Sequence, residues 1–129
     1  METLNQTIIT TTYAGETLSL AASCAVMEIF QREPVHEHIH RLGAQLRKGF
    51  EEIFREEKFP ATTVGVDPGF VINFSQLGDE AESVHCRLFN TLFDKGIFAN
   101  EQWFITYSHQ TSDIDKTLEA MRQSIHQIL

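Results

Sequence analysis

The sequence has few of the residues that mark several protein classes. Its 129 residues include two cysteines, three prolines and one tryptophan. Cys24 and Cys86 lie far apart and form no CxxC pair, so we expect reduced thiols in a cytosolic protein rather than a disulfide-stabilised secreted one. The chain has no repeats and no low-complexity linker, which predicts a single domain over residues 1–129.

Basic residues and long apolar runs are also scarce. Ten Lys and Arg residues stand against 18 Asp and Glu residues, and the formal net charge is −8. Neither nucleic acid nor an anionic membrane is therefore an expected partner. The polar N-terminal residues and the short apolar runs predict neither a signal peptide nor a membrane-spanning segment.

The clearest pattern present is a helix predicted over residues 17–31. Its apolar residues recur at alternating spacings of three and four, and Leu20, Cys24 and Met27 add a second apolar stripe. A helix that is apolar on most sides belongs in a large core or in an interface. We therefore expect self-association or a partner surface at this helix.

A hydroxyl-rich stretch precedes that helix. Residues 10–12 are threonines with strong β preference, and Ala14-Gly15 permits a tight turn. Unpaired N–H groups at a helix N-terminus, together with a threonine hydroxyl, are a chemistry that holds phosphate. The alternative is a hydroxyl-rich helix entry without a ligand.

The remaining elements follow from periodicity and turn residues. A second helix of about 24 residues begins at Pro34, and Gly43 and Gly49 weaken it. Residues 62–66 and 70–74 alternate around a Pro-Gly turn and predict an antiparallel hairpin. The order ααββαβα predicts an α+β fold with helices packed on a small, mainly antiparallel three-stranded sheet.

The last three elements carry specific boundary signals. Asp79 and Glu82 resemble a capping box for a helix that ends at Lys95 and Gly96. Residues 103–108 are predicted as the third strand. Thr111 or Ser112 is the predicted cap of the last helix.

One short motif matches a zinc-peptidase pattern. His36 and His40 belong to an H-E-x-x-H sequence and would share a helix face. Glu56 and Glu57 are poor third ligands, because sixteen residues of one continuous helix span about 24 Å. His85, His109 and His126 could complete a site only through the tertiary fold, so we interpret the motif as a polar helix face and predict no metal site.

The segment T-T-Y-A-G-E-T-L-S-L-A-A resembles the part of class III pyridoxal-phosphate (PLP) aminotransferases that follows the catalytic lysine, on the glutamate-1-semialdehyde aminomutase side of the family. The resemblance continues through Gly96-Ile97-Phe98, Trp103-Phe104-Ile105 and Ser108-His109-Gln110-Thr111. It covers essentially the whole chain in the family's order. It implies roughly the last third of such an enzyme, with residues 1–33 packing on the large domain or dimer interface and residues 34–129 forming the C-terminal small domain of a fold-type I PLP enzyme.

This resemblance implies three site residues. Thr12 matches the threonine that binds the cofactor phosphate across the homodimer, and Gly15 supplies the turn behind it. Glu101 is the one candidate for the substrate-facing glutamate that the aminomutases place in the loop before the last strand, although that loop is shorter here and Gln102-Trp103 departs from the family pattern. The alternative for Glu101 is an ordinary exposed loop acid. His109 resembles the histidine before the last helix, where a turn or capping role is the simpler interpretation.

The residues that perform PLP chemistry are absent from this sequence. None of the four lysines (Lys48, Lys58, Lys95 and Lys116) lies in the glycine-rich setting where the family keeps its cofactor-binding lysine. The resemblance therefore implies that this lysine lies before Met1, that the chain does not catalyse amino transfer alone, and that PLP is not bound by this chain alone. The main alternative is a stand-alone α+β interaction module.

Overall fold

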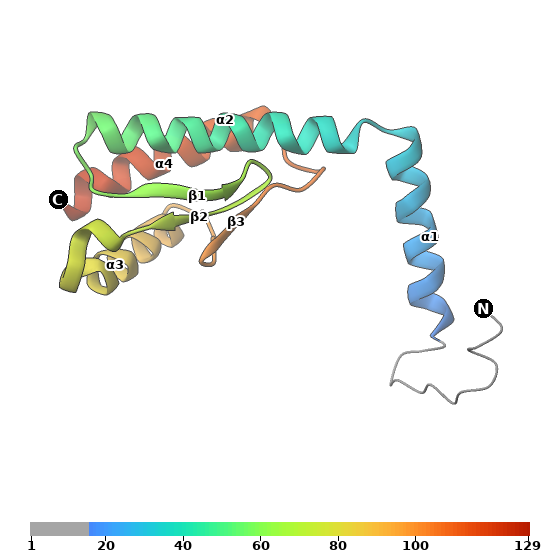
Figure 1. Cartoon of the computed structure of the whole chain (residues 1–129), viewed down its shortest axis with the longest axis horizontal. Helices are drawn as coiled ribbons and strands as arrows, with labels where there is room; N and C mark the ends of the chain where they lie inside the picture. Colours follow the sequence, from blue (N-terminus) through green and yellow to red (C-terminus); the bar gives the residue numbers. More distant parts are fainter. Residues whose placement is uncertain (1–15) are drawn as a thin grey trace. The chain divides into compact units, whose positions relative to one another are not determined.

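The computed structural model describes residues 16–129, which divide into two units at Pro34 and Val35. In the first unit, the described residues form helix α1, Thr17–Arg32 (Figure 1). No residue of α1 is buried, and Leu18, Leu20 and Met27 are between 60% and 77% exposed. The helix predicted over residues 17–31 is therefore present, and its apolar side chains are available for contacts.

The second unit, Val35–Leu129, is an α+β fold. Three antiparallel strands lie in the order β1–β2–β3, and helices α2, α3 and α4 accompany them (Figure 1). The predicted fold class and element order are confirmed, with one added 3-10 helix, η2. The bounds are α2 Val35–Glu56, β1 Thr62–Val66, β2 Gly69–Asn73, η2 Ser75–Glu80, α3 Ala81–Asp94, β3 Gln102–Phe104 and α4 Thr111–Ile128.

The hairpin of β1 and β2 follows the predicted alternation. Val66 pairs with Gly69, so Asp67 and Pro68 form a two-residue connection. Phe70 and Ile72 are buried on one face of β2, as the period of two requires. The same face carries Trp103 from β3, which pairs with Phe70.

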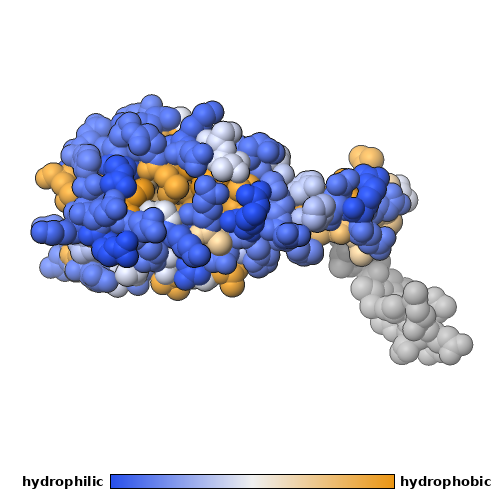
Figure 2. Space-filling view, turned by 90° about the horizontal axis from the view of Figure 1, so that it is seen from above, coloured by the Kyte–Doolittle hydropathy of each residue, from blue (hydrophilic) through white to orange (hydrophobic). Residues whose placement is uncertain are grey.

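The core lies between this face and the three helices. Phe50 of α2 is fully buried, and its ring centroid lies 5.8 Å from that of Phe70 and 4.8 Å from that of Trp103. Phe89 of α3 reaches Trp103 at 6.1 Å. Such aromatic contacts add to the free energy gained by burying apolar area. Figure 2, which looks onto the unit from above, shows a mostly hydrophilic surface with apolar patches between the polar residues.

Gly43 explains how closely α2 approaches the hairpin. A Cβ atom added there would lie 2.0 Å from the Asp67 carbonyl oxygen and 2.9 Å from the Pro68 nitrogen. Both neighbours are backbone atoms, which cannot rotate away. The glycine that weakens the isolated helix is therefore required for the contact between α2 and the turn.

The boundaries of α3 differ from the prediction at its start and agree with it at its end. The N-cap of α3 is Glu80, which makes no side-chain cap hydrogen bond, so the capping box predicted from Asp79 and Glu82 is wrong. Residues 75–80 instead form the 3-10 segment η2, which is kinked at Gly78, and the Ala81 N–H donates to the Gly78 carbonyl at the helix entry. At the other end, Lys95 is the C-cap and Gly96 has φ +80°, which confirms the predicted end of α3.

The start of α4 also differs from the prediction. Its N-cap is Gln110, not Thr111 or Ser112. The Gln110 N–H donates to Asp113 Oδ2 at 2.8 Å. Asp113, the third residue of the helix, thus accepts the backbone N–H of the N-cap residue. This is one of the two hydrogen bonds of a capping box.

Strand β3 is shorter than predicted. It covers only Gln102–Phe104, because the chain turns at Thr106 to His109. The His109 N–H donates to the Thr106 carbonyl at 3.2 Å, and the Thr106 N–H donates to His109 Nδ1 at 3.0 Å. The predicted strand over residues 103–108 is therefore wrong in its second half.

A charged cluster joins α4 to the end of α2. Arg122 donates to Glu56 at 2.8 Å and to Glu57 at 3.0 Å, and His126 Nε2 lies 2.7 Å from Glu57. The hydrogen bond with Glu56 raises the pKa of Arg122 above its ordinary value.

Within residues 16–129, the helices lack the combination of length and hydropathy needed to cross a bilayer.

Candidate functional site

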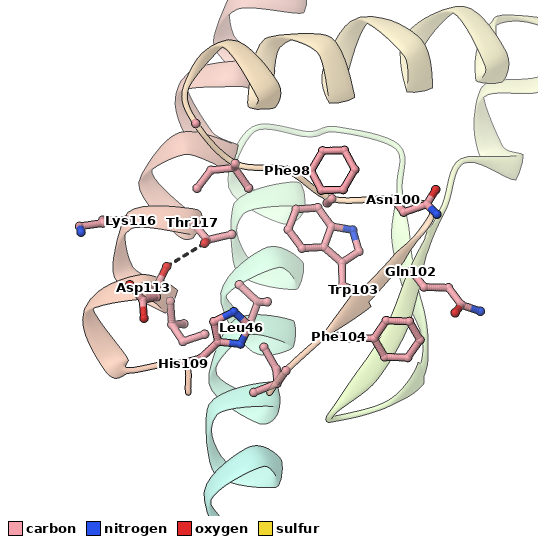
Figure 3. Close-up of a pocket in the computed structure, with 15 residues that line it drawn as sticks. Leu46, Phe98, Asn100, Gln102, Trp103, Phe104, His109, Asp113, Lys116 and Thr117 are labelled. Atoms are coloured by element: carbon pink, nitrogen blue, oxygen red, sulfur yellow. Dashed lines mark hydrogen bonds between the residues drawn. The ribbon is translucent and has the colours of Figure 1, made fainter. Parts of the chain in front are cut away.

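A cavity of about 590 Å³ lies between β3, the loop that precedes it and the start of α4 (Figure 3). Leu46 of α2 contributes to its wall. Its lining is more apolar than polar, and the polar side chains come from the loop before β3, from β3 itself and from the start of α4. Its polar lining side chains include Asn100, Gln102, His109, Asp113, Lys116 and Thr117.

Trp103 forms a rigid part of the cavity wall. Its side chain is 5% exposed and its ring is held by Phe50 and by the stacked Phe70, whose centroid lies 6.5 Å away. The indole Nε1 is buried and finds no hydrogen-bond partner among residues 16–129. A buried donor without a partner is uncommon in folded proteins. As the single tryptophan of the chain, Trp103 also reports on this region by fluorescence.

His109 stabilises the turn at the edge of the cavity. Its Nδ1 accepts the Thr106 N–H, so a neutral ring carries its proton on Nε2. Its carbonyl accepts from His38 Nε2 at 2.9 Å, and the His38 ring stands edge-on to Tyr107 at 5.2 Å. These contacts fix the turn to α2 and support the predicted turn role of His109.

Glu101 lies beside the cavity without lining it. The residue is exposed, and its backbone N–H donates to Asn100 Oδ1 at 2.8 Å. Its two neighbours, Asn100 and Gln102, do line the cavity. The substrate-facing role of Glu101 stays a prediction.

Thr12 and Gly15 lie outside the described residues, so the structure does not place these predicted cofactor contacts. Their predicted roles stay predictions, and the described part of the helix start shows only how its first amides are bonded. Glu16 is the N-cap of α1, and its carboxylate accepts the N–H groups of Leu18 at 2.7 Å and Ser19 at 2.6 Å. Hydrogen bonding to Ser19 and Leu18 lowers the pKa of Glu16. These two amides are therefore already paired with the Glu16 carboxylate.

The histidines of the H-E-x-x-H motif are exposed on α2, and it is His38 between them that makes the described tertiary contact. His85 packs between Phe74 and Phe89, with ring centroids 5.5 and 4.4 Å away. His126 pairs with Glu57. Over residues 16–129, no group of three or more His, Cys, Asp and Glu side chains is arranged to hold a metal ion.

The four lysines lie on helices or helix ends. Lys48 is exposed on α2, Lys58 follows α2 with φ +52°, and Lys95 is the C-cap of α3. Lys116 lines the cavity, but Figure 3 shows its amino group directed away from the other labelled side chains. Sequence reasoning did not anticipate the cavity, because the stretch 96–117 closes on itself, and meets Leu46 of α2, only in the folded chain.

Comparison with solved structures defines the fold class. The chain superimposes on a transaminase with PLP bound with a TM-score of 0.85, and on the FumI protein of Sphingopyxis sp. MTA144, also a PLP-containing structure, with a TM-score of 0.84. Sequence identity is 20% and 19%, and each match covers 96% of this chain and 30% of the other. The fold is therefore that of one part of a PLP transaminase.

Comparison with curated sequences shows which transaminase-like enzymes the chain is similar to. The chain is 31% identical over 127 residues to a glutamate-1-semialdehyde 2,1-aminomutase of Thermus thermophilus, a match that covers 88% of this chain and 30% of the relative. It is 34% identical over 122 residues to the protein of that name from Methanothrix thermoacetophila, covering 86% and 28%. No family model matches the sequence. The chain is thus a homologue of a part of these aminomutases and spans about 30% of their length.

Proposed function

We propose that the chain is the C-terminal part of a class III PLP-dependent aminotransferase or aminomutase and contributes to amino-group transfer as part of a longer polypeptide. PLP, when bound in such an enzyme, supplies the electron sink for the chemistry of amino groups. The observation that carries the proposal is the sequence match to aminomutases across most of the chain, with which the similarity of the fold to PLP transaminases agrees.

In that enzyme, the chain contributes non-covalent contacts to the cofactor, and the lysine that bonds to PLP lies elsewhere in the polypeptide. Thr12 contributes a hydroxyl to the cofactor phosphate, with Gly15 forming the turn behind it, and the cofactor served belongs to the second subunit of a homodimer. The exposed apolar residues of α1 support that assembly, because a surface of this kind on a soluble protein usually marks an interface. The substrate is a small amino compound, and the enzyme is cytoplasmic.

Replacement of Thr12 in the longer polypeptide tests the phosphate contact. Thr12→Val keeps the shape and β-branching of the side chain but removes the hydroxyl. A charge-assisted hydrogen bond is worth roughly 1.5–3 kcal/mol, so the affinity for PLP should fall by about one to two decades. The measurement is the PLP dissociation constant, followed by absorbance, with circular dichroism to show an intact fold.

Thr11→Val is a matched control, because neighbouring residues of an extended segment would point to opposite sides. Thr10→Val, which the same period would place on the side of Thr12, tests the next hydroxyl along. Weakened affinity in Thr11→Val with an unchanged Thr12→Val would show that the contact is displaced by one residue. Unchanged affinity in all three variants would show that this stretch does not contact the phosphate.

A further inference from the structure

Strand β1 has the properties of a strand that pairs with other molecules. Among the strands of residues 16–129, it lies at one end of the sheet and has β2 as its one neighbour. Its sequence is Thr-Thr-Val-Gly-Val, and the side chains of Val64 and Val66 are 52% and 63% exposed. An exposed apolar edge strand that is rich in β-branched residues is a template for intermolecular strand pairing unless something blocks it.

The register shows which backbone groups of β1 face outward. The two-residue connection makes Val66 and Gly69 a hydrogen-bonded pair, and such pairs alternate along an antiparallel ladder. Thr63, opposite Ile72, and Gly65, opposite Phe70, therefore direct their N–H and C=O groups away from β2. These groups form the edge that a second strand would use.

Two side chains of α2 occupy this edge. Glu51 Oε1 accepts the Thr63 N–H at 2.8 Å, and Arg47 Nη1 donates to the Gly65 carbonyl at 3.1 Å. The Thr63 hydroxyl joins the two, because it donates to Glu51 and accepts from Arg47 Nε at 3.0 Å. Arg47 also reaches Asp67 at 3.4 Å. Arg47 and Glu51 are four residues apart and so share one face of the helix.

We propose that Arg47 and Glu51, which we call the edge clamp, prevent β1 from pairing with β1 of a second copy of this chain. A donor and an acceptor from one helix fill one outward acceptor and one outward donor of the strand. The clamp also places two charged groups beside an apolar edge, which makes the approach of another strand unfavourable. The i, i+4 spacing of Arg47 and Glu51 and the strand over residues 62–66 were both visible in the sequence, but the contact between them was not.

The test compares two double variants of the full chain. Arg47→Ala/Glu51→Ala opens the edge. Lys48→Ala/Glu52→Ala removes the same charges at the same spacing from exposed positions of α2 and serves as the matched control. Sedimentation and the infrared signal of intermolecular β-sheet are measured over a range of concentrations. Because two outward hydrogen-bonding groups are freed, the clamp variant should associate at an about tenfold lower concentration than the control.

A third substitution separates edge pairing from general loss of stability. Val64→Lys added to the clamp variant places a cation on the open edge and should restore the behaviour of the control. The single variant Arg47→Ala, which leaves the Thr63 N–H covered, should give an intermediate result. Equal intermolecular β-sheet signal in the clamp variant and its control, or association that Val64→Lys does not reduce, would overturn the proposal.

Discussion

Gly43 and Gly49 show how two identical residues on one helix differ in what they contribute. A Cβ atom at Gly43 would meet backbone atoms of Asp67 and Pro68, whereas a Cβ atom at Gly49 would lie 2.4 Å from Cδ2 of Leu118. The end of a leucine side chain can move and a carbonyl in a tight turn cannot. Sequence reasoning counted both glycines only as a loss of helix propensity.

Gly43→Ala should therefore destabilise the protein despite the better helix propensity of alanine. We expect the free energy of unfolding to fall by about 2 kcal/mol, since overpacking costs more than the propensity gains. Gly49→Ala should change it by less than about 1 kcal/mol, because the two effects offset each other. Urea unfolding of both variants measures this difference, and equal stability of Gly43→Ala and the parent chain would contradict the contact with the turn.

Caps were the least predictable residues. Ser and Thr are favoured N-caps, which is why Thr111 and Ser112 were predicted for α4. The hydrogen bond from Gln110 to Asp113 places the cap one residue earlier. At α1, the carboxylate of Glu16 accepts two of the first helix amides, a cap that the hydroxyl-rich sequence did not single out. Local propensity cannot decide such cases, because several adjacent polar residues can serve the same amides.

At the level of elements, the cap of α4 yields a direct prediction. Asp113→Ala removes the acceptor of the Gln110 N–H and an acidic group from the positive end of the helix. The free energy of unfolding should fall by about 1 kcal/mol. Ser112→Ala is the control and should be close to neutral. A larger loss from Ser112→Ala than from Asp113→Ala, measured by urea unfolding, would restore the original prediction of the cap.

The elements themselves followed well from periodicity. The alternation of Phe70 and Ile72 predicted the buried face of β2, and the apolar spacing of α2, α3 and α4 predicted three amphipathic helices. The third strand was overextended because Ile105 has strand character, whereas the turn that ends β3 depends on a side chain, that of His109. The cavity was not predictable, since Leu46, Trp103 and Ile114 meet only in the folded chain.

At the level of the whole molecule, the exposed apolar side chains of α1 lead us to expect that the chain self-associates. Its Leu20 and Met27 side chains are 60% and 64% exposed, an arrangement that suits an interface. We expect sedimentation over an about tenfold concentration range to show self-association, and Leu20→Glu or Met27→Glu to reduce it. A monomer at every concentration, unchanged by either substitution, would remove the proposed role of α1 in assembly.

The most direct measurement concerns PLP on the chain itself. The chain is proposed to support a cofactor that is bound covalently elsewhere in a longer polypeptide, and its lysines lie on helices or helix ends. We therefore predict that incubation with PLP, followed by borohydride reduction and peptide mapping, gives only slow labelling scattered over Lys48, Lys58, Lys95 and Lys116. Stoichiometric labelling of a single one of these lysines, with a matching change in the visible spectrum, would contradict the proposal that residues 1–129 contribute contacts rather than the covalent site.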